Sequence, residues 1–258
     1  MLIAPTSRPV SAPTRSHPPR TLGILGGMGP LAGAEFFMRV TAAFPADRDQ
    51  AHPVVHLLSN PTVDSRSDAV LAPGRARHDE VERDIRRGIA ALLDLGADVI
   101  AVPCNTAHYF IDRFHNRLFS DPTRAGSSAP VLAHIVDATL SELTASGQSA
   151  AWLLATEGTV RSGVYTARAA AHGVDLRIPG RSTQSTVTRC IEAVKRGDIA
   201  RSVQLAEDLR ALSEGTHMPL VAACTELPIA FRSSADPLPH VSSIDALVAR
   251  TIALLTRP

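Results

Sequence analysis

Short runs of aliphatic and β-branched residues alternate along this chain with longer stretches whose apolar positions recur every three or four residues. A run of the first kind is typical of a buried strand, and a stretch of the second kind is typical of a helix with one apolar face. Strands are expected at residues 21–25, 54–58, 99–102, 131–135, 151–155, 174–178 and 220–223, with a last one near Val241. This alternation predicts the α/β class, in which a mostly parallel sheet is flanked by helices on both faces.

Helices are expected between these strands, at residues 30–43, 77–95, 136–145, 186–196, 199–213 and 244–255, with a further one from Thr159. The turn at residues 26–29 is glycine-rich, and the proline that follows it suits the first turn of a helix. Gly96 is suited to end the helix at residues 77–95. The segment from Asn60 to Gly74 is polar and is expected to be a loop.

The alternation divides into two halves at a stretch rich in Ser, Gly and Pro, residues 120–130. We therefore expect two similar α/β lobes with the active site in the cleft between them. The N-terminal lobe is predicted to comprise residues 21–128 together with 242–258, because the last helix returns to it, and the second lobe residues 129–241. Residues 1–20 contain five prolines and no acidic residue, so they are predicted to be a disordered extension.

Composition limits the classes of function open to the chain. Of its 258 residues 45% are hydrophobic and 20% are charged, and 26 basic and 25 acidic side chains leave a formal net charge of +1. Nucleic acid or an anionic membrane would normally require a clustered basic excess, so neither is expected as a partner. No apolar run reaches the roughly 18–20 residues that span a bilayer. The three cysteines lack Cys-x-x-Cys spacing, which argues against a zinc or dithiol motif, and a reducing, cytoplasmic location is expected.

Two of the three cysteines occupy matching positions. Cys104 follows the buried strand at residues 99–102, and Cys224 follows the strand at residues 220–223. Ligands bind at the carboxyl ends of strands in open parallel sheets, so we expect both sulfurs to face one small molecule between the lobes. A helix that begins after each cysteine is expected to lower the pKa of the thiol and to favour the thiolate. The alternative is a buried apolar role, which is the interpretation for Cys190.

Several segments together carry a resemblance to a known family: GILGGMGPLA at residues 23–32, PCNTAH at 103–108, LLATEGT at 153–159 with SGVY at 162–165, and CTEL at 224–227. In this order they resemble the aspartate/glutamate racemases, and most closely the aspartate racemases. The resemblance covers the chain from about residue 21 to its end. It implies two pseudo-symmetric α/β lobes, a homodimer, and inversion at the α-carbon of an acidic amino acid without a cofactor. Aspartate is the expected substrate, with glutamate as the alternative.

Racemisation requires a base on one side of the α-carbon and an acid on the other. Cys104 and Cys224 would meet this requirement if they faced each other in unlike protonation states, because a cysteine pKa of ~8.5 is easily shifted toward neutrality. The α-hydrogen is weakly acidic, so positioned donors and exclusion of water would have to activate it. We predict these two cysteines as the catalytic residues, with no metal and no cofactor.

The resemblance also implies substrate-binding roles, for Met28, Arg66, Asn105, Thr106, Thr156, Thr159, Lys195 and Thr225. Arg66 occupies the position of an arginine that holds a substrate carboxylate, a task that suits a planar guanidinium. Lys195 resembles a second cationic contact and is the only lysine of the chain. The alternatives are a solvated loop arginine and an ordinary lysine near a helix C-terminus.

The polar residues that follow the cysteines complete the implied site. Asn105, Thr106 and Thr225 would bind the substrate ammonium and α-carboxylate, although Asn and Thr also serve as helix caps. His108 and Glu226 match motif positions of the family, but neither is assigned a chemical step.

Three other interpretations fit the sequence. The turn at residues 27–29, Gly-Met-Gly, is similar to a dinucleotide-binding loop and would indicate an oxidoreductase, but the second strand ends at Ser59 and Asn60 and not at the acid that would hold a ribose hydroxyl. A racemase that uses pyridoxal phosphate would need a Schiff-base lysine, which only Lys195 could supply. The third interpretation is a non-catalytic amino-acid-binding module that kept the cleft and lost turnover.

Overall fold

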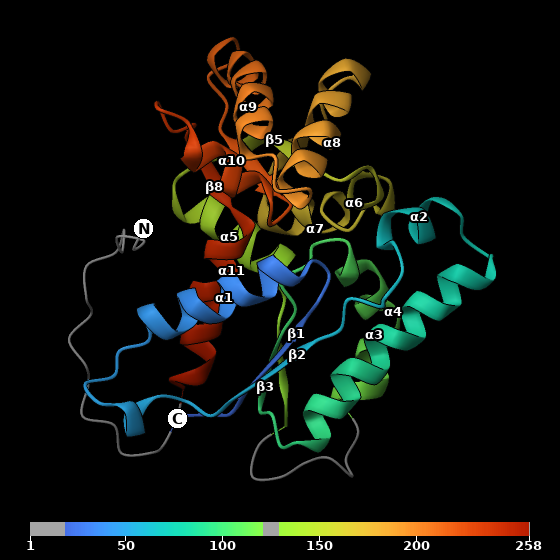
Figure 1. The fold of residues 1–258 in the computed structure, drawn as a ribbon, viewed down its shortest axis with the longest axis vertical. Coiled ribbons are helices and arrows are strands. Elements are labelled where there is room, and N and C mark those ends of the chain that lie inside the picture. The colour runs from blue at the N-terminus through green and yellow to red at the C-terminus, as the bar shows by residue number, and fades with distance from the viewer. Residues whose placement is uncertain (1–18, 121–128, 258) are drawn as a thin grey trace.

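The computed structural model describes residues 19–120 and 129–257, which contain two parallel sheets of four strands each. The first sheet consists of β1 (Leu22–Gly26), β2 (Val55–Ser59), β3 (Val99–Ala101) and β4 (Val131–Ala133). The second consists of β5 (Ala150–Ala155), β6 (Asp175–Arg177), β7 (Leu220–Ala223) and β8 (His240–Ser242). The strand orders are β2-β1-β3-β4 and β6-β5-β7-β8, so the two halves repeat one topology. Figure 1 shows β1, β2 and β3 of the first sheet side by side. The predicted fold class is confirmed.

Helices flank both sheets. Those of the first half are α1 (Pro30–Ala43), α2 (Arg66–Leu71), α3 (Ala76–Asp94), α4 (Ala107–Phe119) and α5 (Ile135–Ala145), with the 3-10 turn η1 (Asp49–Ala51). Those of the second half are α6 (Glu157–Ser162), α7 (Thr166–Ala169), α8 (Arg181–Lys195), α9 (Ile199–Glu214), α10 (Leu227–Ser233) and α11 (Ser243–Leu255), with η3 (Ala170–His172). The helices expected from apolar periodicity are present, with ends shifted by a few residues. None of the helices in the described ranges combines the length and the apolar character that a membrane crossing demands.

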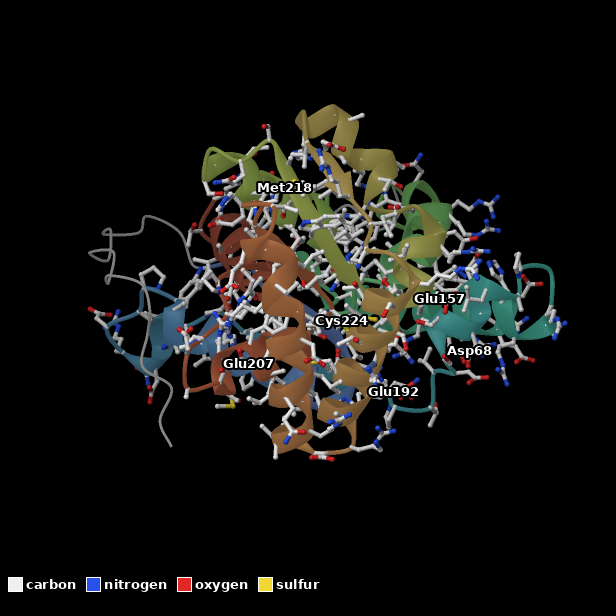
Figure 2. All side chains as sticks on the ribbon, turned by 90° about the horizontal axis from the view of Figure 1, so that it is seen from above. Asp68, Glu157, Glu192, Glu207, Met218 and Cys224 are labelled. Atoms are coloured by element: carbon white, nitrogen blue, oxygen red, sulfur yellow. The ribbon has the colours of Figure 1, made fainter. Side chains whose placement is uncertain are left out.

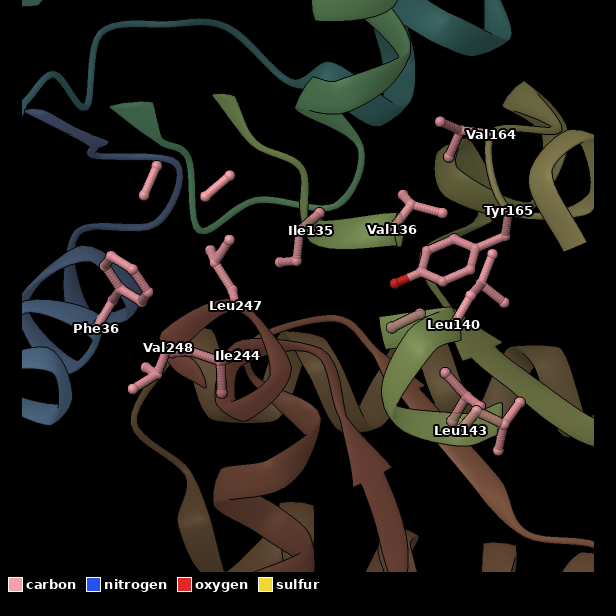
Figure 3. Packing of buried hydrophobic residues seen from close by; sticks show 14 of the residues in the cluster. Phe36, Ile135, Val136, Leu140, Leu143, Val164, Tyr165, Ile244, Leu247 and Val248 are labelled. Atoms are coloured by element: carbon pink, nitrogen blue, oxygen red, sulfur yellow. The ribbon is translucent and has the colours of Figure 1, made fainter. Parts of the chain in front are cut away.

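One apolar core is shared by the two halves. It contains buried residues of β1 and β3 from the first sheet, of β5 and β7 from the second, and of helices α1, α5 and α11. Figure 3 shows Phe36 of α1 pointing toward Leu247 and Val248 of α11, and Tyr165 beside Leu140 of α5. Each large apolar side chain contributes about 1.5–3 kcal/mol when it is fully buried. A continuous apolar layer therefore holds the two sheets in a fixed relation.

The outer face of each sheet has a core of its own. On the first sheet, Ile85 of α3 and Phe110 of α4 pack with Ile100 of β3. On the second, helices α8, α9 and α10 cover the sheet, with Leu209 of α9 and Phe231 of α10 fully buried. Each sheet is thus covered on both faces, as its continuous runs of apolar residues require.

The C-terminal helix packs between the two sheets. Helix α11 packs on α1 and α5 and contacts β3 and β4 of the first sheet as well as β7 and β8 of the second, and the strand before it, β8, pairs with β7. Strand β4 lies in the stretch assigned by sequence to the second lobe, yet it pairs with β3 in the first sheet. The alternation of strands and helices is the same in both halves, so it does not reveal which sheet a strand joins. The predicted lobe boundaries otherwise stay predictions.

The predicted N-terminal extension, residues 1–20, lies outside the described residues except for its last two positions. Most of the predicted connection at residues 120–130 also lies outside them.

The polar segment expected to be a loop contains a short helix, α2. The Ser65 side chain caps it by accepting a hydrogen bond from the main-chain N–H of Asp68 at 3.2 Å, and Ala69 is buried. Helix α2 packs against α6 of the other half so closely that a Cβ atom at Gly158 would lie 2.4 Å from the Cα atom of Ser67. Only glycine leaves room for this approach, and Figure 1 shows α2 beside α6. Arg66 is the first residue of α2, so the same packing positions it near the second half.

Candidate active site

A small cavity lies at the carboxyl ends of the strands of both sheets, with a volume of about 50 Å³. A water molecule occupies roughly 10–15 Å³ by this measure, so the cavity suits a small ligand. Its walls are formed by Met28, Ser65, Arg66, Ser67, Cys104, Asn105, Thr106, Thr156, Lys195, Ala223, Cys224, Thr225 and Glu226. All the residues predicted for the site are therefore brought together here, except Thr159, which lies behind the wall.

The cavity residues come from equivalent places in the two sheets. Met28 follows β1 and Cys104 follows β3, while Thr156 follows β5 and Cys224 follows β7. These four strands are the central ones of the two sheets, and the topology relates β1 to β5 and β3 to β7. In the view of Figure 2 Cys224 lies near the middle of the molecule. The two matching cysteine positions seen in the sequence thus correspond to equivalent strand ends, after β3 in the first sheet and after β7 in the second.

Cys104 is buried, and both its N–H and its carbonyl are hydrogen-bonded. Its N–H donates to the carbonyl of Val102 at 2.8 Å, and its carbonyl accepts a hydrogen bond from Nδ1 of His108 at 2.9 Å. The Nε2 atom of His108 accepts from the main-chain N–H of Ile135 at 3.3 Å. Burial, with a further contribution from His134, lowers the pKa of His108 well below its ordinary value. The ring is therefore neutral, and its two contacts assign the proton to Nδ1.

The Cys224 thiol donates a hydrogen bond to Oε2 of Glu226 at 3.0 Å. Burial raises the pKa of Cys224 well above its ordinary value, the negative charge of Glu226 raises it further, and the positive charge of Lys195 opposes both. The expectation that a helix N-terminus lowers the pKa of this thiol is wrong. Helix α10 is short, and the carboxylate of Glu226 stands beside the sulfur at its start, so burial and that charge outweigh the helix dipole.

Glu226 connects the end of β7 with the first half of the chain. Its Oε2 atom also accepts from the Thr225 hydroxyl at 3.2 Å, and its Oε1 atom would lie 3.6 Å from a Cβ atom at Gly29. Gly29 precedes α1, so the carboxylate stands at a helix N-terminus, where negative charge is favourable.

The glycine turn at residues 27–29 is explained by close packing. Gly27 has a φ of +92°, and a Cβ atom there would lie 2.3 Å from the main chain of Asn60. The loop after β2 thus fills the space over the turn, and the Glu226 carboxylate lies near Gly29, so a pyrophosphate bound at this turn would meet a negative charge. This removes the main argument for an oxidoreductase.

Three threonine hydroxyls join the two halves beside the cavity. The Oγ1 atom of Thr106 lies 2.7 Å from that of Thr159 and 3.1 Å from that of Thr156, and the last two are 3.0 Å apart. Thr156 also caps α6 by accepting from the N–H of Thr159. Thr159 supports the wall from behind, whereas Thr106 and Thr156 reach the cavity.

Asn105 is locked by partners on both sides of its amide. Its Nδ2 donates to the hydroxyl of Ser243 at 3.0 Å, and its Oδ1 accepts from the hydroxyl of Tyr165 at 2.6 Å. Both partners are fully buried. These contacts account for one of the two N–H groups of the amide, which leaves a second donor on a side chain that lines the cavity.

Two cations reach the cavity. The guanidinium of Arg66 donates to the main-chain carbonyls of Val63, Asp64 and Met28, while its Nε atom is buried and has no partner. Lys195 is the last residue of α8, and its ammonium forms no hydrogen bond or ion pair with the residues that the structure describes. The cavity thus combines two positive side chains with one carboxylate, that of Glu226.

Ser65, Ser67 and Ala223 line the cavity without having been predicted. The two serines are brought there by α2, whose pattern Ser65-x-x-Asp68 is a capping signal that could have revealed the helix. Glu226 was noted as a motif residue, but the sequence does not show that its carboxylate meets the thiol. Among the described residues no group of three or more His, Cys, Asp or Glu side chains is arranged to hold a metal ion.

Comparison with known proteins agrees with this geometry. Residues 25–251 match the family model described as Asp/Glu/hydantoin racemase. The chain belongs to the Asp/Glu/hydantoin racemase family. A broad specificity amino-acid racemase, RacX of Bacillus subtilis, is 27% identical over 90% of this chain and 96% of its own length. The family match and this relative support the predicted enzyme class, an amino-acid racemase, which is an isomerase.

Solved structures of racemases share the fold. The aspartate racemase of Picrophilus torridus is 28% identical, with a TM-score of 0.70 over 91% of this chain and 93% of that one. An aspartate racemase homologue from Pyrococcus horikoshii OT3 is 18% identical, with a TM-score of 0.69 over 92% of this chain and all of that one. The second of these likenesses concerns the fold alone.

The link between Glu226 and Cys224 predicts how the thiol reacts. Glu226→Gln removes the negative charge beside the sulfur, so the pKa of Cys224 is expected to fall and its alkylation by iodoacetamide at pH 8 to become severalfold faster. Peptide mass spectrometry of timed samples measures the rate at each cysteine. Cys190 is an internal control, because it is fully buried and burial raises its pKa to about 12. An unchanged or slower reaction at Cys224 would contradict the electrostatic account.

Proposed function

We propose that this chain interconverts the enantiomers of an acidic amino acid, with aspartate as the preferred substrate, without a cofactor and by two thiols that act on opposite faces of the α-carbon. One observation carries the proposal: Cys104 and Cys224 line a single small cavity from the ends of equivalent strands, and Arg66 and Lys195 line it with them. A base, an acid and two carboxylate-binding groups are thereby available to one small ligand.

The scheme requires the two thiols to be in unlike protonation states. Cys224 is protonated in the free enzyme, because burial and Glu226 raise its pKa. Cys104 then acts as the thiolate base on the enantiomer whose α-hydrogen points toward it. Its sulfur takes the proton, the electron pair of the C–H bond passes into the α-carboxylate, and the Cys224 thiol delivers a proton to the opposite face. One proton is gained and one is lost, so the thiolate moves from Cys104 to Cys224.

The opposite direction starts from the other pair of protonation states, so Cys224 must first lose its proton and Cys104 must take up one proton from water. The carboxylate of Glu226 already accepts the hydrogen bond of this thiol at 3.0 Å, so it is the group to which the proton passes. The positive charge of Lys195 favours the thiolate that results. In this scheme Glu226 keeps Cys224 protonated at rest and receives its proton during turnover.

The charges of the cavity favour an acidic amino acid. Aspartate has two carboxylates and one ammonium, and the cavity offers two cations and one carboxylate. The Nε–H of Arg66 is buried without a partner, an arrangement that costs about 1–3 kcal/mol, and a substrate carboxylate would satisfy it. The small volume of the cavity favours aspartate over the longer glutamate.

Removal of either thiol tests the two-base scheme. Cys104→Ala and Cys224→Ala are each expected to lower kcat for racemisation by at least about 100-fold, since general acid–base catalysis contributes on this scale. In deuterated water each variant should retain α-hydrogen exchange for one enantiomer only, and the two variants for opposite enantiomers. Chiral chromatography and NMR measure both reactions without added cofactor.

Cys190→Ala is the matched control, because this third thiol lies in the outer core and should be dispensable for activity. Wild-type racemisation by either of the other two variants would rule out the scheme. Recovery of each enantiomer unchanged from the wild-type protein would instead indicate a binding module.

Lys195 tests the substrate class. Lys195→Gln is expected to raise KM for aspartate about 10- to 100-fold, because a hydrogen bond to a charged group contributes about 1.5–3 kcal/mol. Turnover of alanine, which lacks the second carboxylate, should change little. Arg196→Gln is the control, since this neighbouring cation pairs with Glu192 at 3.7 Å and is not part of the cavity wall. If Lys195→Gln kept the wild-type discrimination between aspartate and alanine, the assignment would be wrong.

A further inference from the structure

A cluster of charged side chains outside the cavity joins the two halves of the chain. Arg168 of α7 donates to both carboxylate oxygens of Asp112 on α4, at 2.7 Å each, and its Nε lies 3.1 Å from Asp137 of α5. His134 contacts the same carboxylate of Asp112 through Nε2 at 3.1 Å. Burial alone would raise the pKa of Asp112, but the hydrogen bonds from His134 and Arg168 outweigh it and lower the pKa to about 2. The Asp112 carboxylate therefore stays ionised and keeps its contacts with His134 and Arg168.

This cluster extends to Cys104 through one buried ring. The rings of His134 and His108 meet edge to face, with centroids 4.5 Å apart. His108 is fully buried, and both its nitrogens are used, Nδ1 on the Cys104 carbonyl and Nε2 on the N–H of Ile135. The ring thus ties the turn after β3 to the start of α5. An unbroken series of contacts connects Arg168 of the second half with the main chain of Cys104.

We propose that His108 is a positioning residue for Cys104, which fixes the direction of the Cys104 sulfur by holding the carbonyl of the same residue, and that His134, Asp112 and Arg168 hold His108 in turn. The inference rests on the proposed two-thiol function and adds to it a group that does not touch the substrate.

The physical reason lies in the short turn that contains Cys104. The N–H and the carbonyl of Cys104 each make one hydrogen bond. Loss of the contact with His108 therefore leaves the Cys104 carbonyl without a donor, and the peptide plane after Cys104 becomes free to rotate. A displacement of about 1 Å at a reacting group can cost roughly 100-fold in rate.

The main chain of Cys224 is not held by a histidine in this way. The residue four positions after Cys104 is His108, whereas the residue four positions after Cys224 is Pro228, and the Cys224 carbonyl accepts from the main-chain N–H of Leu227 at 3.1 Å. Loss of His108 should therefore impair one thiol and spare the other.

The experiment compares His108→Leu with His108→Asn in the full-length protein. The two side chains are similar in shape, and neither can reach the N–H of Ile135. Only Asn places a donor where Nδ1 of His108 stands, so the difference between the variants isolates the hydrogen bond to the Cys104 carbonyl. His115→Leu, on the same helix and away from Cys104, controls for loss of a histidine.

His108→Leu is expected to lower kcat about 10- to 100-fold with KM changed by less than about threefold, and His108→Asn to recover most of that loss. In deuterated water His108→Leu should slow α-hydrogen exchange for the same enantiomer that loses exchange in Cys104→Ala, and leave the enantiomer served by Cys224 near the wild-type rate. If His108→Leu does not fold, His108→Gln replaces it, because its longer amide reaches Ile135 and leaves the Cys104 carbonyl without a donor.

Two failures are distinguishable. Suppose that the two cysteine variants show opposite preferences. The positioning role alone is then overturned if His108→Leu slows exchange of both enantiomers equally, or if His108→Leu and His108→Asn have equal rates. If Cys104→Ala and Cys224→Ala do not show opposite preferences, the two-thiol function is overturned and the positioning role with it.

Discussion

A cysteine at the carboxyl end of a central parallel strand has little freedom of position, because the strand fixes its main chain and the turn that follows fixes the direction of its side chain. This constraint applies twice here, after β3 and after β7, in two sheets of the same strand order. The two strand ends meet one cavity only because α1, α5 and α11 form a single apolar core with both sheets. The chemistry proposed for the thiols thus depends on helix packing that contains none of the catalytic groups.

The backbone is duplicated, but the surroundings of the two sulfurs are not. Cys224 has the carboxylate of Glu226 on its thiol and the ammonium of Lys195 nearby, whereas Cys104 has a neutral buried histidine on its main chain. A two-base racemase needs one thiol and one thiolate at a time, so identical surroundings would give no reason for the two sulfurs to differ. In the proposed scheme the duplicated fold would supply the facing geometry, and the unequal neighbours would supply the unequal protonation.

Much of this arrangement could be predicted from the sequence, because apolar periodicity and strand-end residues are local signals. The strands, the long helices and the positions of Cys104 and Cys224 follow from them. The polar loop that proved to contain α2 was wrongly assigned, since its helix depends on one capping contact, that of Ser65, and on packing against Gly158 far along the chain. Strand β4 was assigned to the second lobe because an alternating pattern does not identify a strand's partner.

The electrostatics of the site could not be predicted, since they depend on contacts that the sequence does not specify. The pKa of Cys224 was expected to fall at a helix N-terminus and is raised by burial and by Glu226. The role inferred for His108 depends on four side chains from two helices and a turn. Sequence spacing relates only His108 and Asp112, which lie four positions apart on α4.

A crystal structure with bound aspartate would test the central claim most directly, by measuring where the α-carbon lies relative to the two sulfurs. The account predicts that the α-carbon lies between Sγ of Cys104 and Sγ of Cys224, within about 4 Å of each and on opposite faces, as proton transfer from both sides requires. Aspartate bound outside the cavity, or bound with both sulfurs on the same face of the α-carbon, would contradict it.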